Sequence, residues 1–133
     1  MGAQYIFVFL GGGLGAVCRY LATSFFAVRF GSAFPYGTLF VNVSGSFLMG
    51  LLIGVLPLLP LFPFGDKYLP ENLRLLLAVG FLGGFTTFSS FSMETLTLLQ
   101  GANALSALWN VLANVAFGVA AAWAGLLLVR AAL

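Results

Sequence analysis

The segment from Gly80 to Glu94, which reads GFLGGFTTFSSFSME, combines glycines, hydroxyls and aromatic rings in a way that can serve an ion site. Glycine loses the most backbone entropy in a helix, and threonine is restricted at its first side-chain torsion, so Gly83, Gly84 and Thr86 favour an interruption of the helix. In a bilayer, an interruption frees main-chain carbonyl and amide groups that must face protein, water or an ion. The sequence therefore predicts a helix broken near its middle, with an ion site at the break.

Two aromatic rings beside this break indicate the charge of the ion. Phe88 and Phe91 are three residues apart on a helix, and hydroxyl residues such as Ser90 flank them. The edge of an aromatic ring carries partial positive charge, so rings can hold an anion without a formal cation. Ordinary lipid or core contact explains most of the fifteen phenylalanines. Together with amide and hydroxyl hydrogens, however, this pair favours an anion over a cation.

The other spans carry small or polar residues at four-residue spacing, which places them on one helix face. These stripes are Gly11, Gly15, Arg19 and Thr23; Thr38, Asn42, Ser46, Gly50 and Gly54; and Ser106, Asn110, Asn114, Gly118 and Ala122. Close helix packing explains the glycine and alanine members. It does not explain Asn42, Asn110 and Asn114, because a side-chain amide in hydrocarbon is costly unless every polar atom has a partner. The asparagines predict a polar route.

Two charged residues lie within apolar spans, and each has two interpretations. Arg19 faces a cavity or partner, as intramembrane charges usually do, or it extends to the membrane interface beside Tyr20. Glu94 is the only acidic residue inside a span. It belongs to a polar pathway, or it reaches the far interface. We favour the pathway for Glu94 and leave both interpretations of Arg19 open.

The composition requires a membrane to position these residues. Of the 133 residues, 62% are hydrophobic and only 6% are charged, whereas about a quarter are charged in a soluble domain. At about 20 residues per crossing, the apolar runs form four helices, at about 4–28, 36–57, 71–99 and 103–130. We therefore expect an all-α integral membrane protein whose single transmembrane domain covers residues 1–133.

The loops and charges bear on orientation and partners. Three prolines (57, 60 and 63) are expected to end the second span, and residues 65–67 to form a polar loop. Lys67, Arg74 and Arg130 fall on one side against Arg29 on the other. So small a bias permits insertion in both orientations. The charge is also too sparse for a nucleic-acid surface.

Several function classes fit poorly. The chain has no histidine, no paired carboxylates and no zinc-type spacing, so we do not expect an enzyme. A small four-span proton-coupled multidrug exporter, which can also be antiparallel, is the main alternative. That chemistry needs a carboxylate near the membrane centre, where the first span has Gly15 and Arg19. A helix-packing subunit without a pore would leave Asn42 and the break unexplained.

Three blocks of the chain resemble the CrcB or Fluc fluoride channels. They are GGLGAVCRY at residues 12–20, GTLFVNVSGSF at residues 37–47, and residues 80–94. They fall in the first three spans, in the order and at the chain size of that family. The third block carries the strongest signal.

The resemblance implies an antiparallel homodimer in the lipid of the cell membrane, inserted in both orientations. It implies two fluoride pores that passively export the ion, and a structural sodium ion at the centre of the dimer. Main-chain carbonyls of Gly83 and Thr86 would bind sodium, and Arg19 would face the aqueous vestibule. The fluoride pore would be lined by Phe88 and Phe91, with Asn42 donating to fluoride, and accompanied by Thr38, Ser90, Glu94, Asn110 and Asn114. Asn110 and Asn114 depart from the family pattern, in which a tyrosine and a serine are common.

Overall fold

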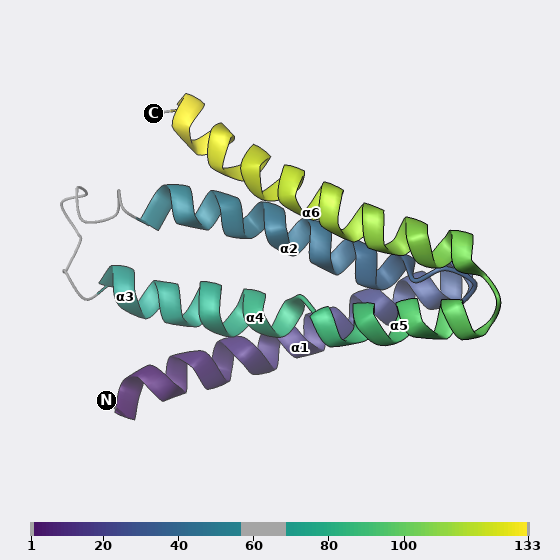
Figure 1. Cartoon of the computed structure of the whole chain (residues 1–133). Helices are drawn as coiled ribbons and strands as arrows, with labels where there is room; N and C mark the ends of the chain where they lie inside the picture. The colour runs from purple at the N-terminus through teal and green to yellow at the C-terminus, as the bar shows by residue number, and fades with distance from the viewer. Residues whose placement is uncertain (1, 57–68, 133) are drawn as a thin grey trace.

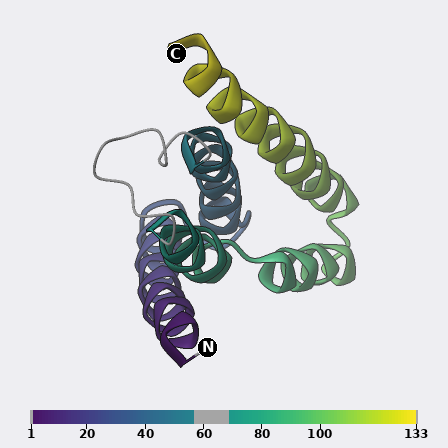
Figure 2. The same cartoon turned by 90° about the vertical axis from the view of Figure 1, so that its left-hand side faces the viewer.

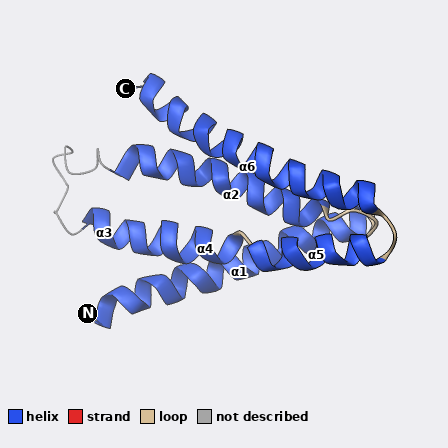
Figure 3. Ribbon diagram, in the orientation of Figure 1, coloured by secondary structure: helices blue, strands red, loops and turns tan. Residues whose placement is uncertain are grey.

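The computed structural model describes residues 2–56 and 69–132, and every regular element within these ranges is helical (Figures 1 and 3). The elements are α1 (Gly2–Phe30), α2 (Tyr36–Val55), α3 (Leu69–Leu73), the π-helix η2 (Arg74–Leu82), α4 (Gly83–Phe85), α5 (Phe88–Gln100) and α6 (Ala104–Ala132). They provide four spans that are long and apolar enough to cross a membrane, which confirms the predicted number. The segment from α3 to α5 makes up the third span.

The helix ends at one side of the bundle follow from local sequence. Gly31, with a φ of 76°, stops α1 and donates its N–H to the Ala27 carbonyl at 2.9 Å, because glycine adopts this left-handed conformation without strain. Asn103 begins α6, where its Oδ1 accepts the N–H of Ser106 at 3.2 Å. At the opposite side, the prolines and polar loop expected within residues 57–67 lie outside the described residues.

Glycines bring the helices into close contact in two pairs, α1 with the first half of the third span, and α2 with α6. A methyl group at Gly15 would collide with the main-chain oxygen of Phe81. One at Gly50 would collide with the oxygen of Ala122, and one at Gly125 with the oxygen of Phe47. The glycine stripes therefore serve helix packing, as their spacing predicts.

The third span is not one straight rod. Its first half begins as α3 and continues as η2, a π-helix of nine residues, before the short α4. After two extended residues the chain resumes as α5, which Figure 2 shows set aside from the line of the first half. The sequence gives no signal for the π-helix. Such segments are rare and often lie near functional sites.

The burial pattern is that of a membrane protein. The largest side chains that are fully buried are Val41, Asn110 and Thr38, so two of the three are polar. Many large apolar side chains are exposed instead, for example Phe9 at 78% and Val28 at 90%. Exposed apolar surface and buried polar groups are expected when the surroundings are lipid. The chain is a multi-pass membrane protein.

Candidate ion site at the third span

The candidate site is built on two extended residues. Thr86 has φ −81° and ψ 161°, and Thr87 has φ −153° and ψ 116°, so α4 ends at Phe85 and α5 begins at Phe88. A helix that ends in this way leaves the carbonyls of its last turn without their usual amide partners. The N–H of Thr87 would donate to the Gly83 carbonyl in a continuous helix. Here it donates to Oδ1 of Asn42 on α2, at 2.8 Å.

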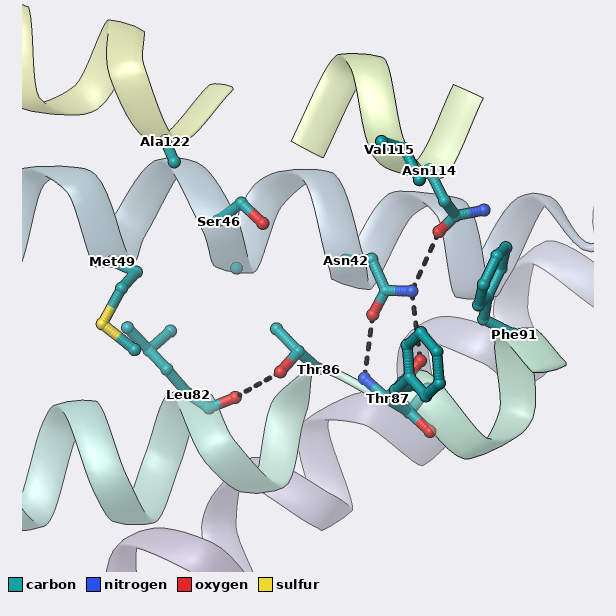
Figure 4. Close-up of a pocket in the computed structure, with 12 residues that line it drawn as sticks. Asn42, Ser46, Met49, Leu82, Thr86, Thr87, Phe91, Asn114, Val115 and Ala122 are labelled. Atoms are coloured by element: carbon teal, nitrogen blue, oxygen red, sulfur yellow. Dashed lines mark hydrogen bonds between the residues drawn. The ribbon is translucent and has the colours of Figure 1, made fainter. Parts of the chain in front are cut away.

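Asn42 pairs with both main-chain groups of Thr87. Besides accepting the N–H, it donates from Nδ2 to the Thr87 carbonyl at 3.2 Å, as a neighbouring β-strand would (Figure 4). The second hydrogen of Nδ2 goes to Oδ1 of Asn114 on α6, at 2.9 Å. Both hydrogens of the Asn42 amide are therefore engaged within the protein in this arrangement.

The three asparagines that the sequence singles out form one connected chain. Nδ2 of Asn114 donates to the main-chain and side-chain oxygens of Asn110, at 2.9 and 3.0 Å. Asn110, which is fully buried, donates to Oγ1 of Thr95 on α5 at 2.9 Å. The hydroxyl of Thr95 donates in turn to the Phe91 carbonyl at 2.8 Å. The chain of donors thus runs from the break through α2 and α6 to α5.

Hydroxyls complete the N-terminus of α5. Oγ1 of Thr87 accepts the N–H of Ser90 at 3.1 Å and donates to the Ser90 hydroxyl at 3.1 Å. Thr87 is therefore the N-cap of α5, and Ser90 lies beside it in the first turn. Neither Thr87 nor Thr95 is among the site residues predicted from the sequence. Threonine is a common N-cap residue, so Thr87, which directly precedes the helix from Phe88, could have been identified as a cap from its residue type.

The four phenylalanines of the segment separate into two pairs. Phe81 and Phe85 stack before the break with ring centroids 5.8 Å apart, and Phe85 is only 8% exposed. Phe88 and Phe91 follow the break with centroids 5.5 Å apart, and Phe88 is 79% exposed. Only the second pair lines the cavity at the break.

A cavity of about 370 Å³ lies at the break (Figure 4). The predicted site residues that line it are Asn42, Thr86, Phe88, Phe91 and Asn114, with the unpredicted Thr87, Ser46, Met49 and Leu82 among the others. A second cavity of about 380 Å³ near the loop after α1 contains Thr38 and Glu94. There the Thr38 hydroxyl donates to Oε1 of Glu94 at 2.7 Å, while the buried Oε2 has no partner among the described residues. Seven predicted residues thus line two separate cavities, one beside Asn42 and the other beside Thr38 on α2.

The remaining predicted residues, Arg19 and Gly83, flank the break. Arg19 is partly buried, and its Nη1 lies 3.5 Å from the Thr86 carbonyl oxygen, at the limit of a hydrogen bond. Gly83 is exposed. The described residues contain no cluster of three or more His, Cys, Asp or Glu side chains that could hold a metal.

Comparison with known proteins gives one consistent result. The sequence profile of the family described as "CrcB-like protein, Camphor Resistance (CrcB)" matches residues 6–126. A protein of Rhodopseudomonas palustris is 46% identical over 96% of this chain and 97% of its own length. One of Citrifermentans bemidjiense is 41% identical over 96% of this chain and 98% of its own length, and one of Vibrio parahaemolyticus is 45% identical over 90% and 88%.

All three relatives are named as a fluoride-specific ion channel, FluC, which is the name of a channel and not of an enzyme. The profile covers all three blocks on which the resemblance was based, and the identities extend over nearly the whole chain. The predicted resemblance is confirmed. On this sequence similarity, with four membrane spans as the fold, the chain belongs to the CrcB family.

Proposed function

We propose that this protein is a fluoride-selective channel that passively exports fluoride across the cell membrane and so lowers its concentration inside the cell. The observation that carries the proposal is the cavity at the break, where Phe88 and Phe91 stand beside the amides of Asn42 and Asn114. The names of the relatives give the ion. Fluoride is small and strongly hydrated, so a narrow route must replace its water by protein hydrogens and dipoles.

The anion route follows α5. Its N-terminus, at Phe88, is the positive end of the helix dipole. The first main-chain N–H groups there have no carbonyl acceptor in a preceding turn. The ring edges of Phe88 and Phe91 and the hydroxyl of Ser90 add further positive charge density. The Asn42 amide would donate to fluoride by exchanging the hydrogen that Asn114 now accepts. Thr38, Glu94 and Asn110 continue the polar track. The guanidinium of Arg19, 3.5 Å from the Thr86 carbonyl oxygen, raises the potential for an anion at the break.

The cation is a structural sodium ion bound by the main-chain carbonyls of Gly83 and Thr86. The Gly83 carbonyl has lost its helical donor, because the Thr87 N–H pairs with Asn42. Broken membrane helices commonly use such freed carbonyls for sodium. A cation here would stabilise the break and raise the local potential for an anion. Sodium is therefore held and not transported.

The partner that completes the site is a second copy of the chain in antiparallel orientation, which gives two pores. Phe88 is 79% exposed, and the carbonyl-bearing turn at Gly83 is open. Nothing within the subunit requires glycine at position 83. A Cβ atom there would lie 3.8 Å from its nearest neighbour, and the φ of Gly83 is −63°. Polar main chain cannot face lipid, so protein, water or an ion must cover this turn. A second copy of the chain would supply the protein surface. The small charge bias permits the two orientations.

The function is tested with purified protein in liposomes loaded with fluoride and chloride, while a potassium ionophore fixes the voltage. We expect rapid loss of fluoride, with chloride retained and no need for a pH gradient. Liposomes without protein provide the control. Retention of fluoride, or equal loss of chloride, would contradict the channel. Proton-driven transport of a cationic drug, without loss of fluoride, would favour the multidrug exporter, for which Glu94, bonded to Thr38, is the available carboxylate.

A further inference from the structure

Asn42 accounts for a feature that the channel hypothesis leaves unexplained, namely why the third span stays open at Thr86 and Thr87. Threonine is only a moderately poor helix former, and the amide of Thr87 could return to the Gly83 carbonyl by continuing the helix. Asn42 Oδ1 accepts that amide hydrogen at 2.8 Å, and Nδ2 donates to the carbonyl of the same residue at 3.2 Å. Both main-chain groups of Thr87 therefore have a partner.

We propose that Asn42 is a positioning residue: by pairing with Thr87 it holds the third span open and keeps the Gly83 carbonyl free for a hard cation. Asn42 then acts on the cation through the backbone and does not touch it. The cation half of this inference rests on the proposed function. The pairing itself does not, and it can be tested without any ion.

The orientation of the Asn42 amide is determined by the break. A main-chain N–H can only donate, so the side-chain oxygen must face Thr87 N and the two hydrogens must face acceptors. One acceptor is Thr87 O, and the other is Oδ1 of Asn114. Asn114 is held by fully buried Asn110, so the amide of Asn42 is fixed from α6 as well as from the break.

The approach of α2 to the break makes these short bonds possible. Gly45 lies three residues beyond Asn42 on α2, and a methyl group there would collide with Cγ2 of Thr86. The helix therefore lies against the extended segment at this level. A side chain as short as asparagine reaches both main-chain groups from this distance.

Two substitutions at the same position separate positioning from ion binding. Asn42→Ala removes the acceptor, so the Thr87 amide loses its fixed partner and pairs only part of the time with the Gly83 carbonyl, where it competes with a cation. Asn42→Asp keeps an oxygen for the Thr87 N–H in either protonation state, although as a carboxylate it cannot donate to an anion. If Asn42 served fluoride alone, both variants would lose flux and neither would alter the cation site.

The test has two readouts, both on the full-length protein in detergent. The first is hydrogen exchange at the Thr87 amide, followed by NMR with threonine labelling. The second is the sodium concentration that gives half of the maximal thermal stabilisation, with a large organic cation replacing sodium to keep ionic strength constant. Asn42→Ala should accelerate exchange and raise the sodium midpoint by about tenfold or more each, equivalent to about 1.4 kcal/mol. Asn42→Asp should change either value by less than about threefold, below half of that free energy.

Two further variants serve as controls. Ser46→Ala alters a hydroxyl of the same cavity one turn along α2 and should leave both readouts unchanged. Asn114→Ala removes the support from α6 but keeps both bonds to Thr87, so its effect should be smaller than that of Asn42→Ala.

The inference is wrong if Asn42→Ala leaves Thr87 exchange as in the unaltered protein, or if Asn42→Asp changes both readouts as much as alanine does. A protein that sodium does not stabilise would overturn the cation half, and the exchange rates would still decide the pairing. Absence of fluoride flux, by contrast, would count against the channel and leave both readouts valid.

Discussion

Replacement of Phe88 by isoleucine lowers fluoride efflux by at least about tenfold, equivalent to about 1.4 kcal/mol in the barrier, whereas Phe81→Ile changes it little. The reason is the position of each ring. Phe88 lies after the break, lines the cavity and loses the positive ring edge on substitution. Phe81 lies before the break and stacks on Phe85. The measurement is the initial rate of fluoride efflux from liposomes that contain either variant, normalised to the protein incorporated.

The Phe81 variant is a matched control because it makes the same chemical change in the same span. Phe88 is mostly exposed in the subunit, so its replacement should not impair folding of the subunit. Equal rates for Phe88→Ile and Phe81→Ile would remove Phe88 from the pore. A drop in both would indicate a general loss of packing.

Substitution of Gly15 by leucine abolishes the folded protein or lowers its midpoint of thermal unfolding by about 10 °C or more, since overpacking costs about 1–3 kcal/mol and can cost more. A Cβ atom at Gly15 would collide with the main-chain oxygen of Phe81, and a backbone cannot move aside as a side chain can. Thermal unfolding in detergent, followed by the fraction that remains monodisperse, provides the measurement.

Gly13→Leu is the control on the same helix. A Cβ at Gly13 would have no atom of another helix within 4 Å among the described residues, so this variant should unfold near the temperature of the unaltered protein. If both variants are equally stable, the contact between α1 and the first half of the third span is not as close as described.

The sequence predicts the architecture well because membrane insertion depends on properties that are local along the chain. Hydrophobic length alone gives four spans, and four-residue spacing identifies the glycine faces on which the helices pack. The mid-span asparagines could be identified as partnered groups, because an unsatisfied amide is too costly in hydrocarbon.

The sequence does not predict which partners those amides choose. The pairing of Asn42 with Thr87 joins residues 45 positions apart, and its geometry depends on how closely α2 approaches the break. The family resemblance implies that Asn42 donates to fluoride, yet both hydrogens of its amide are engaged within the subunit. The π-helix η2 is also unpredicted, because residues such as Leu75 to Leu77 fit α- and π-helices equally well.

The phenylalanines of this segment separate into two pairs. Neighbouring hydroxyl residues distinguish Phe88 and Phe91 in the sequence, although spacing alone places them in one aromatic run with Phe81 and Phe85. The two extended threonines turn α5 away, so that one pair stacks before the break and the other borders the cavity. A two-residue change in backbone conformation thus decides which rings can meet an ion.

The reversal potential of the purified protein in a planar bilayer, with a fluoride gradient balanced by an opposite chloride gradient, tests fluoride selectivity most directly. With a tenfold fluoride gradient in a chloride background, we predict a reversal potential that approaches the fluoride equilibrium value of about 59 mV at symmetrical pH. A reversal potential near zero or at the chloride equilibrium value, or a current that appears only with a proton gradient, would contradict the account.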